Sequence, residues 1–241
     1  MQNFHIKIIH MKKIALLFLS ILFFATYSIQ AQKSFSGEIR FQIKIEGTDD
    51  PNLLSSVESR VIDISILGNK SKTVQKDEMA SATIIWDGDK ETSAFVIEIT
   101  GMGKYYKKWN TEQWKEKNKF NEFSFSYVDE YKTICGYKCQ KVVVMTTNLE
   151  DDSTTETTIY VSKEIGTPKL NGDKYVGLEG YPLIQMEPIK QYCDECFVVI
   201  EAIKITPKKI KDVDFLLPDD AKSIDENPEL KEMLKGLFGE E

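Results

Sequence analysis

Histidine is almost absent from this chain. The only two histidines, His5 and His10, stand at the extreme N-terminus. Without imidazole, the rest of the chain cannot build a Ser-His-Asp or Cys-His catalytic centre or a histidine-ligated zinc site. The Ser-x-x-Lys, Gly-x-Ser-x-Gly, phosphate-loop, dinucleotide-binding and calcium-loop signatures are also missing. We therefore expect a protein that is not an enzyme, with no catalytic residue, no metal and no cofactor.

Positive charge is also scarce, above all as arginine. Arg40 and Arg60 are the only arginines, so few residues offer bidentate recognition of phosphate. The whole chain has a formal net charge of −7, with 31 basic and 38 acidic residues. Residues 1–31 hold three of the lysines and no acidic residue, so their removal leaves 28 basic and 38 acidic residues, a net charge of −10. This balance argues against nucleic acid as a partner.

The chain has a single long apolar run, which lies near the N-terminus. Met11 is followed by two lysines, an apolar run over residues 14–25, and Ala31 just before a polar stretch. These three parts are typical of a secretory signal peptide spanning residues 1–31, with Met11 as an alternative true start. The run is shorter than the roughly 20 residues a spanning helix needs, so we expect no membrane span in the mature chain; a retained anchor is the alternative. The expected localisation is periplasmic or secreted.

The rest of the chain alternates between apolar and polar residues over many short stretches. Such period-two alternation is typical of half-buried strands. An Asp-Gly pair at residues 87–88 predicts a hairpin, and Gly68-Asn69 predicts a turn. The predicted strands cover residues 35–45, 62–66, 82–86, 95–99, 105–109, 123–127, 140–147, 157–162, 174–188 and 197–205. We expect a mainly β fold: an antiparallel meander of roughly ten or eleven strands in a curved sheet or incomplete barrel, forming a single domain over residues 32–241.

Two stretches depart from the strand period. A short helix is expected from Asp50-Pro51 to about residue 60, with proline in the first turn. A C-terminal amphipathic helix is expected from about Asn227, which can cap it. Its apolar face would consist of Leu230, Met233, Leu234, Leu237 and Phe238. We expect this helix to pack on the sheet or cover one end of a barrel; a partner-binding or membrane-surface helix is the alternative.

The four cysteines form two close pairs. Cys135 and Cys139 flank an apparent three-residue hairpin loop, and Cys193 and Cys196 are separated by two acidic residues. An even number in an exported protein favours disulfides, and we expect each pair to bridge locally. A cross-bridge between the pairs, a zinc site with four cysteine ligands and a redox Cys-x-x-Cys are the alternatives. The redox alternative is disfavoured because the intervening carboxylates should raise the thiol pKa.

Lysines and aromatic residues are interleaved over residues 104–120. The candidates for a surface interaction are Lys104, Lys107, Lys108, Trp109, Trp114 and Lys115. This surface could meet an anionic glycan, a lipid head group or a partner protein. The competing interpretation is an alternating strand whose aromatic residues enter the core while its lysines stay solvated.

Three segments resemble a family of exported proteins of unknown function from Gram-negative bacteria. Residues 134–141 (ICGYKCQK) resemble its LGYKCKK hairpin, residues 180–184 (GYPLI) its strand entry, and residues 208–218 (KKIKDVDFLLP) its closing segment. The similarity covers mainly residues 130–220. Residues 177–180 (GLEG) show a weaker resemblance to the related exported family named for a Gly-Leu-Pro-Gly-Leu-Ile motif, with Glu179 in place of the proline.

The resemblance implies a fold similar to that of the outer-membrane lipoprotein carriers, an incomplete antiparallel barrel around an apolar cavity closed by short helices. It assigns no catalytic residue. A hydrophobic, lipid-like or lipoprotein ligand is therefore expected. The candidate ligand-binding residues lie on apolar strand faces: Phe41, Trp86, Phe95, Phe125 and Tyr127. These side chains would equally fill a dry core. The alternative function is a structural or protein-interaction module of the cell envelope without a small-molecule ligand.

Overall fold

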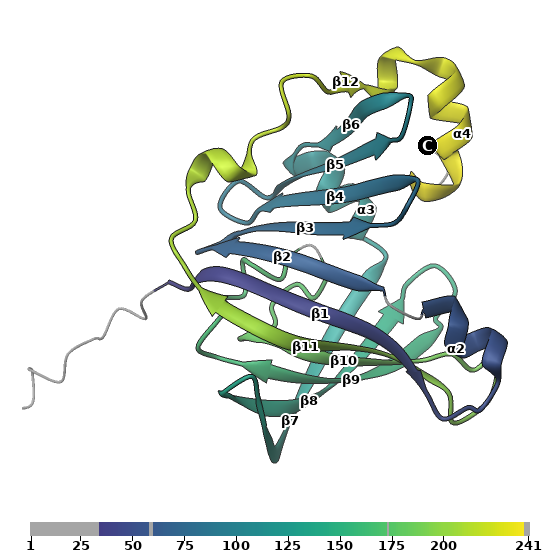
Figure 1. The fold of residues 1–241 in the computed structure, drawn as a ribbon. Coiled ribbons are helices and arrows are strands. Elements are labelled where there is room, and N and C mark those ends of the chain that lie inside the picture. Colours follow the sequence, from purple (N-terminus) through teal and green to yellow (C-terminus); the bar gives the residue numbers. More distant parts are fainter. Residues whose placement is uncertain (1–33, 58–59, 173, 239–241) are drawn as a thin grey trace, which may run out of the picture. The chain divides into compact units, whose positions relative to one another are not determined.

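The computed structural model describes residues 34–57, 60–172 and 174–238. The predicted signal peptide lies outside these residues. The described part of residues 34–241 forms one compact unit. Its secondary structure, shown in Figure 1, is mainly β.

Twelve strands are found among the described residues, and they form a single sheet. Their bounds are β1 (Ser36–Glu46), β2 (Val61–Leu67), β3 (Lys70–Lys76), β4 (Ala80–Asp87), β5 (Thr92–Ile99), β6 (Gly103–Trp109), β7 (Asn121–Ile134), β8 (Tyr137–Asn148), β9 (Thr154–Ser162), β10 (Tyr181–Pro188), β11 (Phe197–Pro207) and β12 (Lys222–Ser223). The order across the sheet is β12-β6-β5-β4-β3-β2-β1-β11-β10-β9-β8-β7. All neighbours are antiparallel except β12 and β6.

The sheet does not close on itself, because β7 and β12 stand at its two ends. The predicted fold class is therefore confirmed, including the incomplete closure. The predicted turn at Gly68-Asn69 joins β2 to β3, and the hairpin predicted at Asp87-Gly88 joins β4 to β5. Gly68 has a positive φ of 61°, a conformation that glycine adopts without steric cost.

Few helices accompany the sheet. They are α2 (Pro51–Val57), α3 (Thr111–Asn118), α4 (Pro228–Phe238) and the 3₁₀ turns η1 (Asp212–Phe215) and η2 (Ile224–Glu226). The helices expected near residue 50 and after Asn227 are thus present. Helix α3 was not expected; a capping box between Asn110 and Gln113 supports its first turn. No helix in the described ranges is long and apolar enough to span a bilayer.

The C-terminal helix α4 packs against one part of the sheet. Asn227 caps it, because the Leu230 backbone N–H donates to the Asn227 side-chain oxygen at 3.1 Å. Leu230 and Leu234 are buried with Tyr105 of β6 and Ile224. Met233, which was expected on the same apolar face, is 57% exposed and is not part of it. The side chains of residues 237 and 238 lie outside the described set. The helix therefore covers strands β5 and β6 through two leucines.

Candidate functional site

One face of the sheet carries all five candidate ligand-binding residues. Cross-strand register links Tyr127 to Val142, Ile159, Gln185, Ile200 and Ile43 in succession, and Phe41 follows on the same face of β1. In the other half of the sheet the register links Ile39 to Ile64, Thr73, Ile84 and Phe95. Trp86 and Phe125 lie two residues from members of these rows and so share the face. We call it the inner face.

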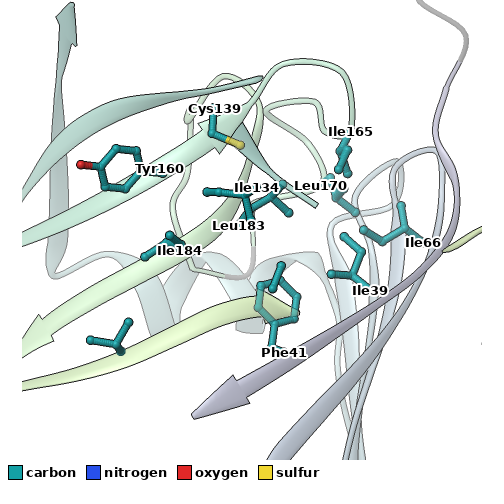
Figure 2. Close-up of a cluster of buried hydrophobic side chains, with 12 residues drawn as sticks. Ile39, Phe41, Ile66, Ile134, Cys139, Tyr160, Ile165, Leu170, Leu183 and Ile184 are labelled. Atoms are coloured by element: carbon teal, nitrogen blue, oxygen red, sulfur yellow. The ribbon is translucent and has the colours of Figure 1, made fainter. Parts of the chain in front are cut away.

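Much of the inner face is covered by the β9–β10 connection, residues 163–180. Tyr175 and Leu178 of this connection are buried against Val142 and Val144 of β8. Its earlier residues, Ile165 and Leu170, enter a second buried cluster. Figure 2 shows that cluster, in which Leu170 lies beside Ile39 and Ile66 and Phe41 is close by. The connection therefore covers part of the inner face and contributes side chains to the core.

Asn171 fixes the shape of this connection from within. Its side chain is 3% exposed, and its amide nitrogen donates to the carbonyl oxygens of Leu178 at 3.0 Å and Gly180 at 2.5 Å. Buried carbonyl groups need such partners because they have lost water. One side chain thus ties the middle of the connection to its C-terminal end.

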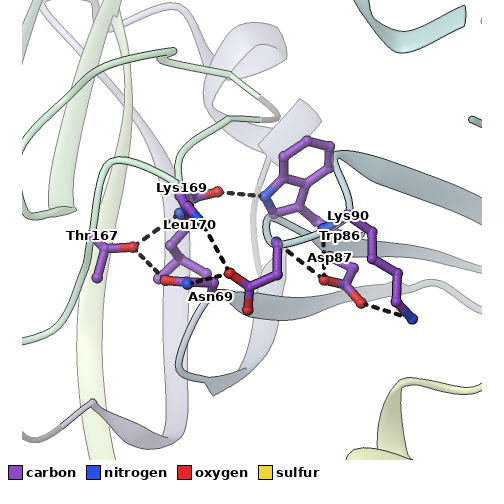
Figure 3. A network of polar contacts seen from close by, with 8 residues as sticks. Asn69, Trp86, Asp87, Lys90, Thr167, Lys169 and Leu170 are labelled. Atoms are coloured by element: carbon purple, nitrogen blue, oxygen red, sulfur yellow. Dashed lines mark hydrogen bonds and ion pairs between the residues drawn. The ribbon is translucent and has the colours of Figure 1, made fainter. Parts of the chain in front are cut away.

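A polar network joins the connection to two strand turns. The Trp86 indole N–H donates to the Lys169 carbonyl oxygen at 2.8 Å, and Thr167 donates to Asn69 at 2.6 Å. Asp89 accepts from Asn69 at 2.9 Å and forms an ion pair with Lys169 at 3.2 Å. Figure 3 shows these contacts between the connection and the turns after β2 and β4. The network positions the connection above the inner face.

Gly172 of the connection lies directly on Trp86. A Cβ atom at this glycine would come within 2.5 Å of the Trp86 ring, and Trp86 is 1% exposed. Only glycine allows the backbone to approach the ring this closely. Trp86 therefore supports the backbone of the connection at Gly172.

A cavity of about 180 Å³ remains between the connection and the inner face. Its walls come from strands β1 to β4, β10 and β11, and its cover comes from the connection. Most of its lining is apolar or aromatic: Phe41, Ile62, Ile64, Ile84, Tyr181, Pro182 and Ile200. Thr73, Asn171, Lys174, Tyr175 and Gln185 complete the lining. Such apolar walls with a few polar groups are typical of ligand sites, although drug-sized sites measure roughly 300–1,000 Å³.

One part of this lining carries a small polar cluster. Lys174 donates to the Gln185 side-chain oxygen at 3.0 Å and forms an ion pair with Glu187. The Tyr175 hydroxyl donates to the same Gln185 oxygen at 3.3 Å. Burial lowers the pKa of Lys174, but Tyr175 and Glu187 raise it by more, so the amine stays protonated at neutral pH. The cluster therefore presents hydrogen-bonding groups next to an apolar cavity.

A second hollow of about 430 Å³ lies on the other side of the connection. It is lined in part by Trp86 and Trp114, whose ring centroids are 4.9 Å apart, and by Gly172 and Val176 of the connection. Glu91 and Lys115 also line it, and they form an ion pair with each other at 3.1 Å. The connection thus divides the space over the inner face into two hollows.

The structure does not bring the five candidate ligand-binding residues into one site. Phe41 lines the 180 Å³ cavity, and Trp86 lines the second hollow. Phe95 packs with the residues under α4, and Phe125 packs with the β8–β9 cluster. Tyr127 is 38% exposed, and its hydroxyl accepts from the Glu179 backbone N–H at 3.1 Å. Sequence reasoning missed Lys174 and Gln185, because residues 174–188 were expected to form one continuous strand, whereas β10 begins only at Tyr181.

The candidate surface residues are also separated. Lys107 is only 6% exposed and packs on Trp109, so it does not belong to a solvated surface. Side chains alternate between the two faces of a sheet along each strand, so residues 105, 107 and 109 all lie on the inner face. Lys107 therefore lies there although it is charged. Trp114 is turned towards Trp86. The remaining candidates stay accessible: Lys104 pairs with Asp220, Lys108 lies over Tyr106 and Lys115 pairs with Glu91.

The two cysteine pairs differ. Cys193 and Cys196 form a disulfide, as expected. Cys135 and Cys139 are free, which corrects the expected local bridge. Ile134 pairs with Tyr137, so the hairpin loop has two residues and Cys135 lies within it, with a φ of 48°. Cys139 then stands opposite Lys132 instead of Cys135. Burial raises the pKa of the Cys139 thiol to about 11.

The four cysteines do not assemble a zinc site in this structure. Cys193 and Cys196 are joined in a disulfide, so neither can bind a metal ion as a thiolate. Within the described ranges, no three or more histidine, cysteine, aspartate or glutamate side chains are grouped to hold a metal ion.

Comparison with known proteins adds no assignment. No family model matches the chain, and no curated protein matches it.

Proposed function

We propose that this protein is a non-enzymatic periplasmic or secreted binder of a hydrophobic ligand, either a lipid-like molecule or the acyl part of a lipoprotein. The observation that carries the proposal is the apolar cavity of about 180 Å³ between the inner face and the β9–β10 connection. An apolar chain would exchange water for isoleucine and aromatic side chains there, which is favourable by roughly 25 cal/mol per Å² of buried surface.

The form of the sheet supports this proposal. An open, mostly antiparallel sheet around an apolar cavity is the architecture that the resemblance to lipoprotein carriers implies. The cavity is small, so the bound part would be a short chain segment. The connection, held by Asn171 and by the Trp86 contact, limits the space and would set how much of the ligand enters.

Native mass spectrometry tests the proposal. The protein is expressed from its full coding sequence in a Gram-negative host and purified from the periplasm without reducing agent. We expect a chain that begins at Gln32, has one disulfide and carries a lipid-sized added mass. A protein with one disulfide, no added mass and no uptake of added short-chain amphiphiles would overturn the proposal. Recovery of the uncleaved chain in the cytoplasm would contradict the expected export.

A further inference from the structure

The polar cluster beside the cavity combines one cation with one anion. Lys174 is the only charged side chain that lines the cavity among the described residues, and its ion-pair partner is Glu187 of β10. The side chains of Lys174 and Glu187 are 47% and 38% exposed. The cluster therefore lies where the cavity meets solvent, and its two charges cancel.

Gln185 gives the cluster a neutral hydrogen-bonding group. Its side-chain oxygen accepts from both Lys174 and Tyr175. A primary amide also has two N–H donors, so the same side chain can donate to a ligand oxygen. An incoming polar group thus finds donors from Lys174 and Gln185, and an acceptor at Glu187, within one small area.

This arrangement favours an uncharged head group. A ligand carboxylate would have to share Lys174 with Glu187 and would repel it, and a ligand ammonium would repel Lys174 in the same way. At this partly exposed site a charged head group would give up part of its hydration and gain no net electrostatic attraction, because the attraction to one member of the pair is offset by repulsion from the other. Hydroxyl and amide groups can donate to one member of the cluster and accept from the other without adding charge.

Resting on the proposed function, we propose that the cavity selects an amphiphile with a short apolar chain and an uncharged hydrogen-bonding head group, such as a glycerol ester. The apolar chain lies along Phe41, Ile64 and Ile200, and the head group contacts Lys174 and Gln185 at the solvent-exposed end.

The test compares three amphiphiles that share an eight-carbon chain: monooctanoylglycerol, octanoate and octylamine. Binding to the purified protein is measured by isothermal titration calorimetry at pH 7. We expect the wild-type protein to bind monooctanoylglycerol at least about tenfold more tightly than either charged compound, which corresponds to about 1.4 kcal/mol.

Two variants should change the selectivity in opposite directions. Glu187→Gln leaves Lys174 without its carboxylate partner, so the affinity for octanoate should rise about tenfold. Lys174→Gln leaves Glu187 without its cation, so the affinity for octylamine should rise instead. The double variant is neutral again and should return to a preference for monooctanoylglycerol. Glu38→Gln is the matched control, because it breaks an ion pair with Lys208 that lies outside the cavity lining.

The outcomes separate the two proposals. If all three compounds bind equally and the variants change nothing, ligand binding stands and the head-group inference is wrong. If the wild-type protein binds none of the compounds, both proposals are overturned. Circular dichroism of each variant establishes that it is folded, and the double variant keeps the inference testable if one single variant is unstable.

Discussion

Cys135 and Cys139 have different environments although they lie four residues apart. Cys135 is exposed in the hairpin turn, whereas Cys139 is fully buried in the main core cluster. Burial raises the pKa of Cys139 to about 11. The thiolate is the reactive form of cysteine. At pH 8 only about one in a thousand Cys139 thiols would be ionised, so the side chain would react slowly even if a reagent reached it.

We therefore predict selective alkylation. Iodoacetamide at pH 8 should modify Cys135 in the folded protein and leave Cys139 unmodified until denaturant is added. Peptide mapping by mass spectrometry measures both sites, and the disulfide-linked Cys193 and Cys196 serve as internal controls. An intact mass lower by four hydrogens, which requires a second disulfide, would contradict the free pair.

Glu130 is positioned by an irregularity in β7. Residues 128–130 are opposed by a single residue of β8, and this bulge turns Glu130 towards Tyr160 and Lys141. The Tyr160 hydroxyl donates to one carboxylate oxygen, and Lys141 donates to the other at 3.0 Å. The hydrogen bonds from Tyr160 and Lys141 lower the pKa of Glu130, and burial together with Glu130 raises the pKa of Tyr160 to about 12.

This lowered pKa predicts a pH-dependent contribution to stability. A carboxylate whose pKa is lower in the folded than in the unfolded state stabilises the fold above the unfolded value, and loses that effect as pH falls through the folded value. The free energy of unfolding of Glu130→Gln should therefore lie below that of wild type at pH 6, and the difference should shrink by pH 3. Urea unfolding measures it, with Glu122→Gln on the same strand as control. A difference independent of pH would refute the assignment.

At the scale of elements, alternation predicted most strands because a sheet with one buried face imposes period two on its residues. Helix α3 was missed because residues 111–118 carry no apolar stripe; its one sequence signal, Asn110 followed by Gln113, is a capping box. The β9–β10 connection was missed because it has no regular secondary structure. Its buried apolar residues therefore follow neither the strand nor the helix period. The candidate cavity depends on that connection, so its polar residues could not be predicted from strand patterns.

The connection is predicted to depend on Asn171. Asn171→Ala leaves the buried carbonyls of Leu178 and Gly180 without their donor, so the free energy of unfolding should fall by about 1–3 kcal/mol. Hydrogen exchange should also quicken for backbone amides in the connection. Asn121→Ala, at an exposed site, is the control and should change stability by less than about 0.5 kcal/mol. Equal effects of the two substitutions would contradict the role given to Asn171.

Helix α4 is predicted to be held by its two buried leucines. Leu230→Ala and Leu234→Ala remove side chains that are 3% and 6% exposed, so each should lower the free energy of unfolding by about 2–5 kcal/mol. Met233→Ala, at a 57% exposed position of the same helix, should change it by less than about 0.5 kcal/mol. Chemical denaturation measures all three. A large effect at Met233 would mean that the helix packs through another face.

At the scale of the whole molecule, the apolar inner face of the open sheet is covered by other segments of the chain. The β9–β10 connection fills the inner face beside β8 and β9, and α4 covers β5 and β6. The sequence left open whether the apolar strand faces enclose a ligand cavity or fill a dry core, and the structure has a largely filled interior with a remaining cavity of about 180 Å³. The proposed ligand binding depends on that remaining space.

Filling the cavity is the most direct test. Ile84 lines it and is 44% exposed, so Ile84→Trp should occupy the space at little cost to folding. Ile203→Trp places the same side chain at a 49% exposed position of β11 that does not line the cavity. We predict that the affinity for monooctanoylglycerol, measured by calorimetry, falls at least about tenfold in Ile84→Trp and is unchanged in Ile203→Trp. Undiminished binding by a folded Ile84→Trp variant would contradict a ligand site in the cavity.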